Sequence, residues 1–367
     1  MKQDVIVIGA GIIGLATAEQ LLLQGAKVTI LERNTAGQES SWAGGGILSP
    51  LCPWDYSDEV TQLTSYSASL FPTWCSVLHQ ETGIDPEYDV SGMLILPPFD
   101  QKAALLWCSR REVKIKCCAT PALESNNINV EGLLLPDIAQ VRNPRLLQAL
   151  RQRIMQLGGN LIEHCAVTDV KFMARRAQSS ISSYGEFFAD HFVICAGAWS
   201  PEILKNHAPE LNIRPIKGQM LLFKFEQPPL PKILVQNGVY LIPRRDGHLL
   251  VGSTLEDVGF DKRTTVSARE CLLARAYPIL PALRTMPIIQ QWSGLRPASI
   301  DNVPTIGKHP IITNVLINAG HFRYGVTMAP ASAKILVNEI TGAKQPLDIA
   351  PYQVGSHSAV FRDFLKP

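Results

Sequence analysis

The sequence lacks three features that would each point to a different class of protein. Its 34 basic and 32 acidic residues nearly cancel, which leaves a formal net charge of +2 at pH 7. This balance favours neither a nucleic acid nor an anionic membrane as a partner. No apolar run approaches the roughly 20 residues that a membrane-spanning helix needs. We therefore expect a protein that acts neither on nucleic acid nor within a membrane.

Cysteine pairs with the spacing of a metal or redox site are the third absence. Eight cysteines occur, at positions 52, 75, 108, 117, 118, 165, 195 and 271, and none forms C-x-x-C. The only close pair is Cys117-Cys118, so neither a zinc site nor a dithiol motif is indicated. Cys165 and Cys195 lie in apolar runs and are expected in the core. The pattern predicts a cytoplasmic protein with reduced thiols and without a metal site.

Length and hydrophobicity set the scale of the fold. The chain has 367 residues, of which 46% are hydrophobic. That is enough for two domains, or for one large α/β domain with an inserted lobe.

The first 33 residues have the pattern of a dinucleotide-binding βαβ unit. Apolar strands are expected over 4–8 and 27–31, with a helix over 12–24 between them. Three glycines in G-x-G-x-x-G join the first strand to the helix. They permit a tight turn, a close approach of the backbone to a pyrophosphate, and close packing of helix on strand. The helix N-terminus also favours phosphate. The cofactor-binding residues expected here are Gly9, Gly11, Ile12, Ile13 and Gly14.

An acidic residue completes this unit. Glu32 follows Gly9 by 23 residues, where a carboxylate can accept both hydroxyls of a ribose and repel a 2′-phosphate. The adjacent Arg33 could instead favour NADP. A secretory signal over 5–18 is the competing hypothesis. It is disfavoured because Asp4 stands where a basic flank belongs and because the pattern continues in register to Glu32.

Three further glycine-rich segments favour a long flavin cofactor over a nicotinamide. Residues 40–47 combine serines with glycines, a strand-to-helix turn surrounds Gly197, and a turn over 320–325 precedes a long helix. Glycines let the backbone run close to an extended ligand, and serines offer hydroxyls to phosphate. The alternative for residues 40–47 is a flexible linker.

The remaining segments divide between helices and short strands. We expect a helix over 55–83 that is kinked or broken at Pro72, and helix and loop over 100–125. A helix should start at 143–144, with Asn143 as its cap and Pro144 in its first turn. One strand is expected over 161–172.

Residues 213–255 change character to alternating strands separated by turns, with a hairpin turn over 245–248. The predicted fold is α/β: a Rossmann-like FAD-binding domain with an inserted antiparallel-sheet substrate domain (α+β). The predicted boundaries are about 1–48, 135–212 and 300–345 for the FAD-binding domain. They are about 49–134 and 213–299 for the substrate domain, with a peripheral tail over 346–367.

Three motifs in the second half carry a family resemblance. They are Y-x-I-P-R at 240–244, W-x-G-L-R-P at 292–297 and A-G-H-F-R-x-G at 319–325. In this order, and with the glycine turn at the N-terminus, they resemble the flavin-dependent glycine oxidases within the D-amino-acid oxidase and sarcosine oxidase group. The resemblance runs from about residue 4 to 342.

The resemblance implies roles for individual residues. Glu32, Arg33 and the backbone of Val167 match the adenosine side of FAD. The loop along the pyrophosphate and flavin corresponds to Ser40, Ser41, Gly45, Gly46 and Ile47. The segment at the flavin ring corresponds to His321, Phe322, Arg323, Tyr324, Gly325, Val326 and Thr327.

The resemblance also implies a substrate site. Arg296 matches the residue that grips the substrate carboxylate, and Tyr240 and Arg323 match its helpers. Each has a plainer alternative: a structural ion pair for Arg296, a core position for Tyr240, and a solvent-facing side chain for Arg323. His321 could touch the flavin through its backbone alone.

The implied activity is oxidative deamination of glycine, sarcosine and small D-amino acids. A hydride passes from the α-carbon to flavin N5, and oxygen yields hydrogen peroxide. A role in thiamine biosynthesis and a homo-oligomeric assembly are also implied. Gly238 and Leu255 stand where the relatives place a histidine and a methionine, so the preferred amine stays open. The sarcosine oxidase relatives attach flavin through a cysteine near the segment that matches Arg296-Pro297. No cysteine follows Cys271 here, so the resemblance predicts non-covalent FAD.

Three other functions are weighed against this one. A flavin dehydrogenase could pass electrons to a quinone or a carrier protein. The chain could instead resemble the oxidase domain of a tRNA-modifying protein, although it lacks a methyltransferase and a basic surface. A nicotinamide-only enzyme would leave the extra glycine-rich segments unexplained.

Overall fold

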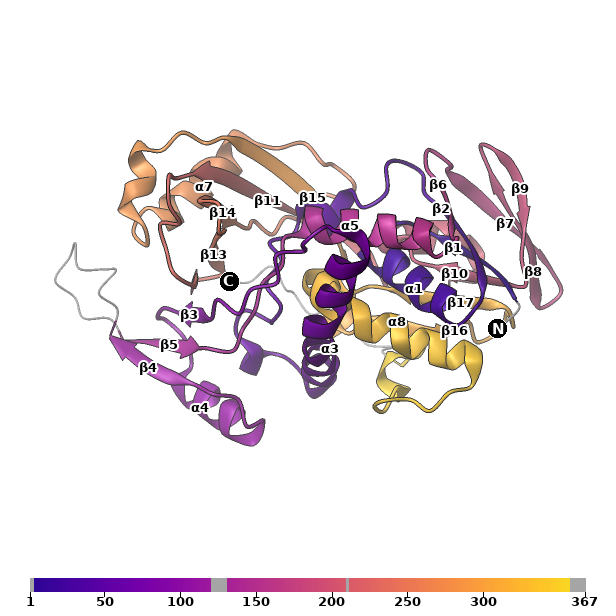
Figure 1. Ribbon diagram of the computed structural model, residues 1–367, viewed down its shortest axis with the longest axis horizontal. Helices are drawn as coiled ribbons and strands as arrows, with labels where there is room; N and C mark the ends of the chain where they lie inside the picture. The colour runs from indigo at the N-terminus through magenta and orange to yellow at the C-terminus, as the bar shows by residue number, and fades with distance from the viewer. Residues whose placement is uncertain (1–2, 120–130, 209–210, 357–367) are drawn as a thin grey trace.

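Two large sheets with helices packed around them make up the molecule (Figure 1). The computed structural model describes residues 3–119, 131–208 and 211–356. The chain passes between the two sheets several times, so each sheet is built from distant segments. The predicted α/β class and its second, largely antiparallel sheet are both present.

The first sheet has six strands in the order β16-β17-β10-β1-β2-β6. Its neighbours are parallel, except that β16 runs antiparallel to β17. Strand β1 is buried on both faces, which explains its continuous apolar run. The strands are β1 (Asp4–Ile8), β2 (Lys27–Leu31), β6 (Asn160–Ile162), β10 (His191–Ile194), β16 (Thr305–Lys308) and β17 (Val315–Ala319).

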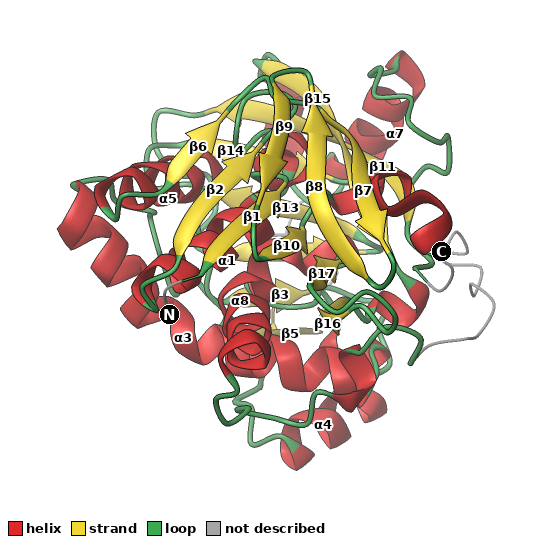
Figure 2. Cartoon of the chain, turned by 90° about the vertical axis from the view of Figure 1, so that its right-hand side faces the viewer, coloured by secondary structure: helices red, strands yellow, loops and turns green. Residues whose placement is uncertain are grey.

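Different layers cover the two faces of this sheet. Val5 and Val7 pack into a core with four helices, whereas Ile6 and Ile8 pack with a three-stranded antiparallel sheet. The small sheet lies in front of β1 and β10 in Figure 2. The helices are α1 (Ile12–Leu23), α3 (Asp58–Thr82), α5 (Asn143–Gln156) and α8 (Gly325–Thr341), and the strands are β7 (Val167–Met173), β8 (Arg176–Ser182) and β9 (Gly185–Phe188).

The second sheet has eight strands in the order β15-β11-β14-β13-β12-β3-β5-β4, antiparallel except for the pair β12 and β3. Alternate residues face opposite ways: Leu241 and Val251 pack under α7, while Ile242 and Leu250 join Tyr240 on the other face. The strands are β3 (Met93–Ile95), β4 (Lys116–Ala119), β5 (Glu131–Leu135), β11 (Arg214–Lys224), β12 (Ile233–Gln236), β13 (Val239–Pro243), β14 (His248–Gly252) and β15 (Gln290–Ala298). The remaining helices are α2 (Glu39–Ala43), α4 (Gln101–Arg110), α6 (Ser200–Leu204) and α7 (Val266–Ala276).

The helix predictions need two corrections. Of the kink or break expected at Pro72, the break does not occur, because α3 continues through this residue to Thr82. The buried side chains of Phe71 and Trp74 hold this part of the helix in the core, and that packing outweighs one missing backbone hydrogen bond. Asn143 is not the cap of α5, because Arg142 occupies that position. The Asn143 amide instead donates to the carbonyl oxygens of Ser41 and Gly44.

The strand predictions also need correction. The single strand expected over 161–172 is two strands, β6 and β7, which lie in different sheets. The chain turns between them at His164, whose φ of 57° is left-handed, and the Cys165 N–H donates to the Glu32 carbonyl. Strand β4 occupies part of 100–125, where helix and loop were expected, and residues 120–125 lie outside the described residues.

Two findings bear on the domain division. Helix α3 shares its core with α1, α5 and α8, so we propose to draw the FAD-binding boundary after α3 instead of at residue 48. Tyr352 of the predicted tail is 1% exposed and donates to the Glu59 carbonyl. That part of the tail is therefore anchored in the core, and 357–367 lie outside the described residues.

None of the helices described is long and apolar enough to cross a membrane. In the same residues, no group of three or more His, Cys, Asp or Glu side chains is arranged to hold a metal ion.

Candidate functional site

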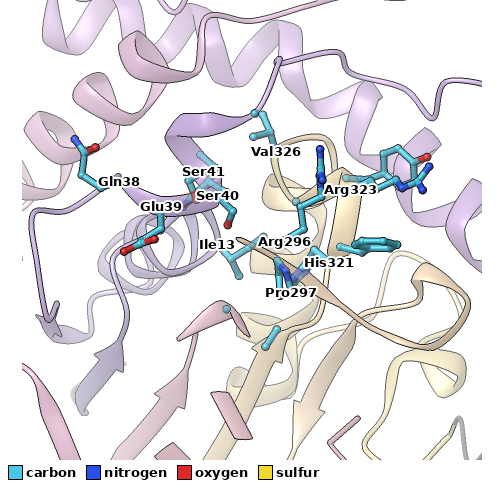
Figure 3. Close-up of a pocket in the computed structure, with 18 of the residues that line it drawn as sticks. Ile13, Gln38, Glu39, Ser40, Ser41, Arg296, Pro297, His321, Arg323 and Val326 are labelled. Atoms are coloured by element: carbon cyan, nitrogen blue, oxygen red, sulfur yellow. Dashed lines mark hydrogen bonds between the residues drawn. The ribbon is translucent and has the colours of Figure 1, made fainter. Parts of the chain in front are cut away.

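One cavity of about 1080 Å³ extends between the two sheets and takes its walls from both (Figure 3). It has room for a ligand at the upper end of the usual range for small-molecule sites. Its lining includes every residue predicted for cofactor or substrate except one, Gly14. These are Gly9, Gly11, Ile12, Ile13, Glu32, Arg33, Ser40, Ser41, Gly45, Gly46, Ile47, Val167, Gly197, Tyr240, Arg296, His321, Phe322, Arg323, Tyr324, Gly325, Val326 and Thr327.

The turn between β1 and α1 depends on glycine for steric reasons. Gly9 has a φ of 103°, which L-residues rarely adopt. A Cβ at Gly14 would lie 1.9 Å from the Gly9 carbonyl oxygen. Gly14 therefore permits α1 to pack against the turn, and it does so outside the cavity.

A serine extends the helix N-terminus into the cavity. The Ile12 N–H donates to Ser41 Oγ at 2.9 Å. A hydroxyl that accepts one hydrogen bond keeps its own proton to donate. Ser41 can therefore donate a hydrogen bond to an anion while it accepts one from the N-terminus of α1. Both side chains line the cavity, so this region fits a phosphate.

Glu32 is fixed by backbone donors at the end of β2. Its two carboxylate oxygens accept from the N–H groups of Ala10 at 2.8 Å and Asn34 at 2.9 Å. A carboxylate has further lone pairs, and Glu32 also lines the cavity, where it can accept ribose hydroxyls.

Arg33 lines the cavity, but its guanidinium already contacts two other side chains. Its guanidinium lies 3.5 Å from the ring centroid of Trp199 and its Nη2 is 3.0 Å from Glu39 Oε1. Both partners hold the side chain in place. This arrangement argues against the NADP alternative, which needs that arginine for a 2′-phosphate.

Arg244 was not among the predicted site residues, but its guanidinium binds the glycine loop at Gly45. Its Nη1 donates to Gln140 Oε1 at 2.7 Å and to the Val141 carbonyl at 2.9 Å, and its Nη2 donates to the Gly45 carbonyl at 2.8 Å. Burial lowers the pKa of Arg244 to about 10, so the guanidinium remains charged at neutral pH. The sequence signal was present, since Arg244 ends the Y-x-I-P-R motif.

The N-terminus of α8 is also hydrogen-bonded to the glycine loop, at Ile47. Thr327 Oγ1 donates to the Ile47 carbonyl at 3.0 Å. The His321 imidazole is buried and contacts Ser332 Oγ through Nε2 at 2.9 Å. Burial lowers the pKa of His321 to about 3, so it is neutral near pH 7.

Two arginines face the cavity without an acidic partner. Arg296 donates to the Thr254 carbonyl at 3.2 Å and to Ser253 Oγ at 2.6 Å. Among the residues that the structure describes, no carboxylate forms an ion pair with Arg296 or Arg323. Burial lowers the pKa of Arg296, Tyr240 opposes that change, and Arg323 adds to it. The pair is suited to an incoming carboxylate, which arginine binds with two parallel hydrogen bonds.

A second overlooked residue, Gly218 on β11, makes room for Arg296. A Cβ at Gly218 would lie 2.1 Å from Arg296 Nη1 and 2.2 Å from Nη2. The guanidinium therefore lies flat against the strand backbone. An isolated glycine inside a strand pattern often marks such a close approach, and this signal was available in the sequence.

Tyr240 and Trp292 complete the lining and its support. The Tyr240 hydroxyl faces Met220 Sδ at 3.9 Å, and its ring lies beside Gly45. Trp292 Nε1 donates to the Ala43 carbonyl at 3.0 Å, so this motif residue supports the loop.

Figure 3 shows how the polar groups are distributed. Arg296 and Arg323 lie on one side of the close-up, and Gln38 and Glu39 lie on the other. The cavity therefore offers a glycine turn, serine hydroxyls and a helix N-terminus to phosphates. It also offers a carboxylate to a ribose and a separate pair of cations to a small anion. These groups together fit FAD and one small substrate that carries a carboxylate.

Comparisons with known proteins agree with this geometry. The profile of the family described as FAD dependent oxidoreductase matches residues 4–339. A glycine oxidase of Pseudomonas aeruginosa is 42% identical, over 96% of this chain and 98% of that protein. A bifunctional protein ThiO/ThiG of Synechocystis is 32% identical, over 93% of this chain and 52% of that protein.

A solved structure gives the same result for the fold. The crystal structure of glycine oxidase from Geobacillus kaustophilus superposes with a TM-score of 0.90 at 25% identity, covering 98% of this chain and all of that one. The resemblance drawn from the three motifs is thereby confirmed, and so are the predicted fold class and the FAD cofactor. The chain belongs to the FAD dependent oxidoreductase family and is similar, over nearly its whole length, to the glycine oxidases.

Proposed function

We propose that this flavoenzyme oxidises glycine and other small amines that carry a carboxylate, such as sarcosine and small D-amino acids. The product is an imine, which water converts to a 2-oxo acid and ammonia or an amine, and oxygen is the electron acceptor. The observation that carries the proposal is the pair Arg296 and Arg323, which shares the FAD cavity and has no acidic partner among the described residues.

The chain's contribution to catalysis is chiefly orientation. Arg296 is held by Ser253 and Thr254 and can bind a carboxylate with fixed geometry. When bound, FAD would supply the redox chemistry, as the acceptor of a hydride from the α-carbon and the donor of electrons to oxygen. Correct placement of the reacting atoms lowers the barrier without a catalytic base, provided that the amine binds unprotonated. His321 also lines the cavity and is neutral near pH 7, so it adds no positive charge there.

The preferred amine depends on two positions that line the same cavity as Arg296, namely Gly238 and Leu255. Gly238 has no neighbouring atom within 4 Å of the place where a Cβ would lie, so this wall is open. Leu255 packs with Ile216, Ala298 and Phe322. An amine with a larger substituent than that of glycine therefore fits the proposal as well as glycine does.

Several finer points belong to the proposal and rest on family resemblance. They are hydrogen peroxide as the second product, a cytoplasmic homo-oligomer, and supply of the glycine imine for the thiazole of thiamine. The similarity to a protein named ThiO/ThiG supports the last of these.

The test is anaerobic reduction of the purified yellow enzyme by glycine, sarcosine and D-alanine. We expect each to bleach the flavin, and air to restore its colour with release of peroxide. Arg296→Ala should retain FAD but raise the KM of the amine roughly 30-fold or more, because a charged contact is lost. The proposal fails if no small amino acid bleaches the flavin, and Arg296 is misassigned if the variant keeps the parental KM.

A further inference from the structure

We propose that five residues form a clamp over the adenosine side of the FAD site, and that this clamp sets how tightly FAD is retained. Its members are Arg33, Glu39, Trp199, Phe260 and Lys262, and the name clamp is used below for this set. Three of them come from the dinucleotide-binding half and two from the segment that follows β14.

The inner part of the clamp lines the cavity beside Glu32. Arg33 lies over the ring of Trp199 at 3.5 Å, and its Nη2 is 3.0 Å from Glu39 Oε1. All three side chains line the cavity, as does Glu32 itself. Cation and ring attract each other through the ring quadrupole, which fixes Trp199 next to the expected ribose site.

The outer part of the clamp reaches across from the substrate side. The Phe260 ring lies 5.1 Å from that of Trp199 at an angle of 31°. Lys262 Nζ lies 2.9 Å from Glu39 Oε1, the oxygen that also contacts Arg33. The side-chain contacts therefore run in one chain from Phe260 through Trp199, Arg33 and Glu39 to Lys262, and the backbone of residues 260–262 joins its two ends.

The backbone of the outer segment is anchored to the second sheet. Ser293 Oγ on β15 donates to the Lys262 carbonyl, and the buried Lys217 on β11 donates to the Arg263 carbonyl at 3.2 Å. Asp261 pairs with Arg263 through both oxygens. Phe260 and Lys262 are thus presented by a fixed segment and contact the other half of the molecule through their side chains.

Glu39 shows that the arrangement is specific. It is the first residue of α2 and has a φ of 59°, a left-handed conformation that L-residues with a Cβ seldom adopt. This backbone conformation places the carboxylate between Arg33 and Lys262. Strained backbone positions cluster at ligand-binding sites, and this one joins the two halves of the molecule beside the cavity.

The consequence concerns the cofactor and not the amine. A clamp at the adenosine side should slow FAD dissociation while leaving the carboxylate site around Arg296 unchanged. Phe260 is 41% exposed and Lys262 is about half exposed, so truncating either should not unfold the protein.

The test compares Phe260→Ala and Lys262→Ala with Phe188→Ala, a matched control on β9 whose ring is 70% exposed. Apoprotein is titrated with FAD and with FMN, which lacks the adenosine, and flavin fluorescence gives both dissociation constants. We expect each clamp variant to bind FAD at least 5-fold more weakly, with an unchanged FMN affinity and an unchanged KM for the amine at saturating FAD. The double variant should lose less than the product of the two single effects, because its residues share one network.

Three results would overturn the proposal. They are FAD affinity within 2-fold of the parent in both single variants, an equal loss for Phe188→Ala, or an equal loss of FMN and FAD affinity. The last result would place the effect on the flavin side or on general stability. None of these readouts depends on which amine is the substrate, so the clamp can fail while the proposed function stands, and the reverse.

Discussion

At the scale of single residues, the charged groups that line the cavity differ in whether they have a partner within the protein. Glu32 is held by two backbone donors and Arg33 by two side chains, whereas Arg296 and Arg323 face the cavity without an acid among the described residues. Sequence reasoning named these residues because the motifs fixed their order. It could not show that Arg33 is paired with an acid whereas Arg296 is not, since that difference depends on Glu39 and Trp199 lying close to Arg33 in space.

Gly218 gives a residue-scale prediction for the substrate site. Its missing side chain lets the Arg296 guanidinium lie against β11, and an added methyl group would overlap Nη1 at 2.1 Å. Gly218→Ala should therefore displace the guanidinium by about 1 Å. We expect KM for glycine to rise or kcat/KM to fall roughly 10- to 100-fold, because displacement of this size disrupts orientation. Steady-state kinetics with a peroxide readout would measure KM and kcat/KM, and flavin absorbance would show whether the variant retains FAD.

Lys224→Ala is the control for that variant, because it changes the exposed end of the same strand. If Gly218→Ala retains parental kinetics, the close approach of Arg296 has no part in substrate binding. If it loses flavin as well, the substitution has disturbed more than the carboxylate site.

At the scale of elements, the predictions succeeded where local patterns were strong. β1 and β2 are apolar runs, α1 follows a glycine turn, and β13 with β14 surround the turn at 245–248. They were wrong where tertiary packing decides. α3 continues through Pro72 because the buried Phe71 and Trp74 hold this part of the helix in the core, and β6 and β7 separate at His164 into different sheets. The polar β8 (Arg176–Ser182) had no apolar run to indicate it.

The link between β13 and the glycine loop gives an element-scale prediction. Arg244 bonds to Gln140, Val141 and Gly45, and it is 5% exposed. Arg244→Ala removes the donor of three hydrogen bonds, two of them buried and the one to Gly45 part-buried, at roughly 1 kcal/mol each, so the free energy of unfolding should fall by about 3 kcal/mol. Urea denaturation of the holoenzyme would measure this, and FAD affinity should fall with it.

The adjacent Arg245 provides the matched control. Its side chain is 55% exposed, and it contacts Asp85 and Asp89 near the surface. Arg245→Ala should change stability by only about 0.5 kcal/mol or less. Equal losses in the two variants would contradict a special role for the buried arginine.

At the scale of the whole molecule, the site is assembled from contacts between distant parts of the chain. Arg244 and Gly45 are 199 residues apart, Trp292 and Ala43 are 249 apart, and Thr327 and Ile47 are 280 apart. Composition and local patterns carry no signal for such pairs. The motifs therefore gave the members of the site, while only the structure shows the cavity between two sheets that brings them together.

This assembly predicts that FAD stabilises both halves together, and more than a shorter flavin does. A ligand that binds only the folded state stabilises it by about 2.7 kcal/mol at 100 times its dissociation constant. FAD can reach Glu32 and Ser41 at one end and the α8 N-terminus at the other, whereas FMN lacks the adenosine and cannot reach Glu32 while its ring lies at α8. Apoprotein is first obtained by acid precipitation, which should leave the flavin in the supernatant because no cysteine follows Cys271. Its thermal midpoint should then rise with FAD concentration and rise less with FMN at equal concentration. Equal shifts for the two flavins would mean that the glycine turn and Glu32 contribute nothing to binding, and flavin that remains with the precipitate would refute non-covalent attachment.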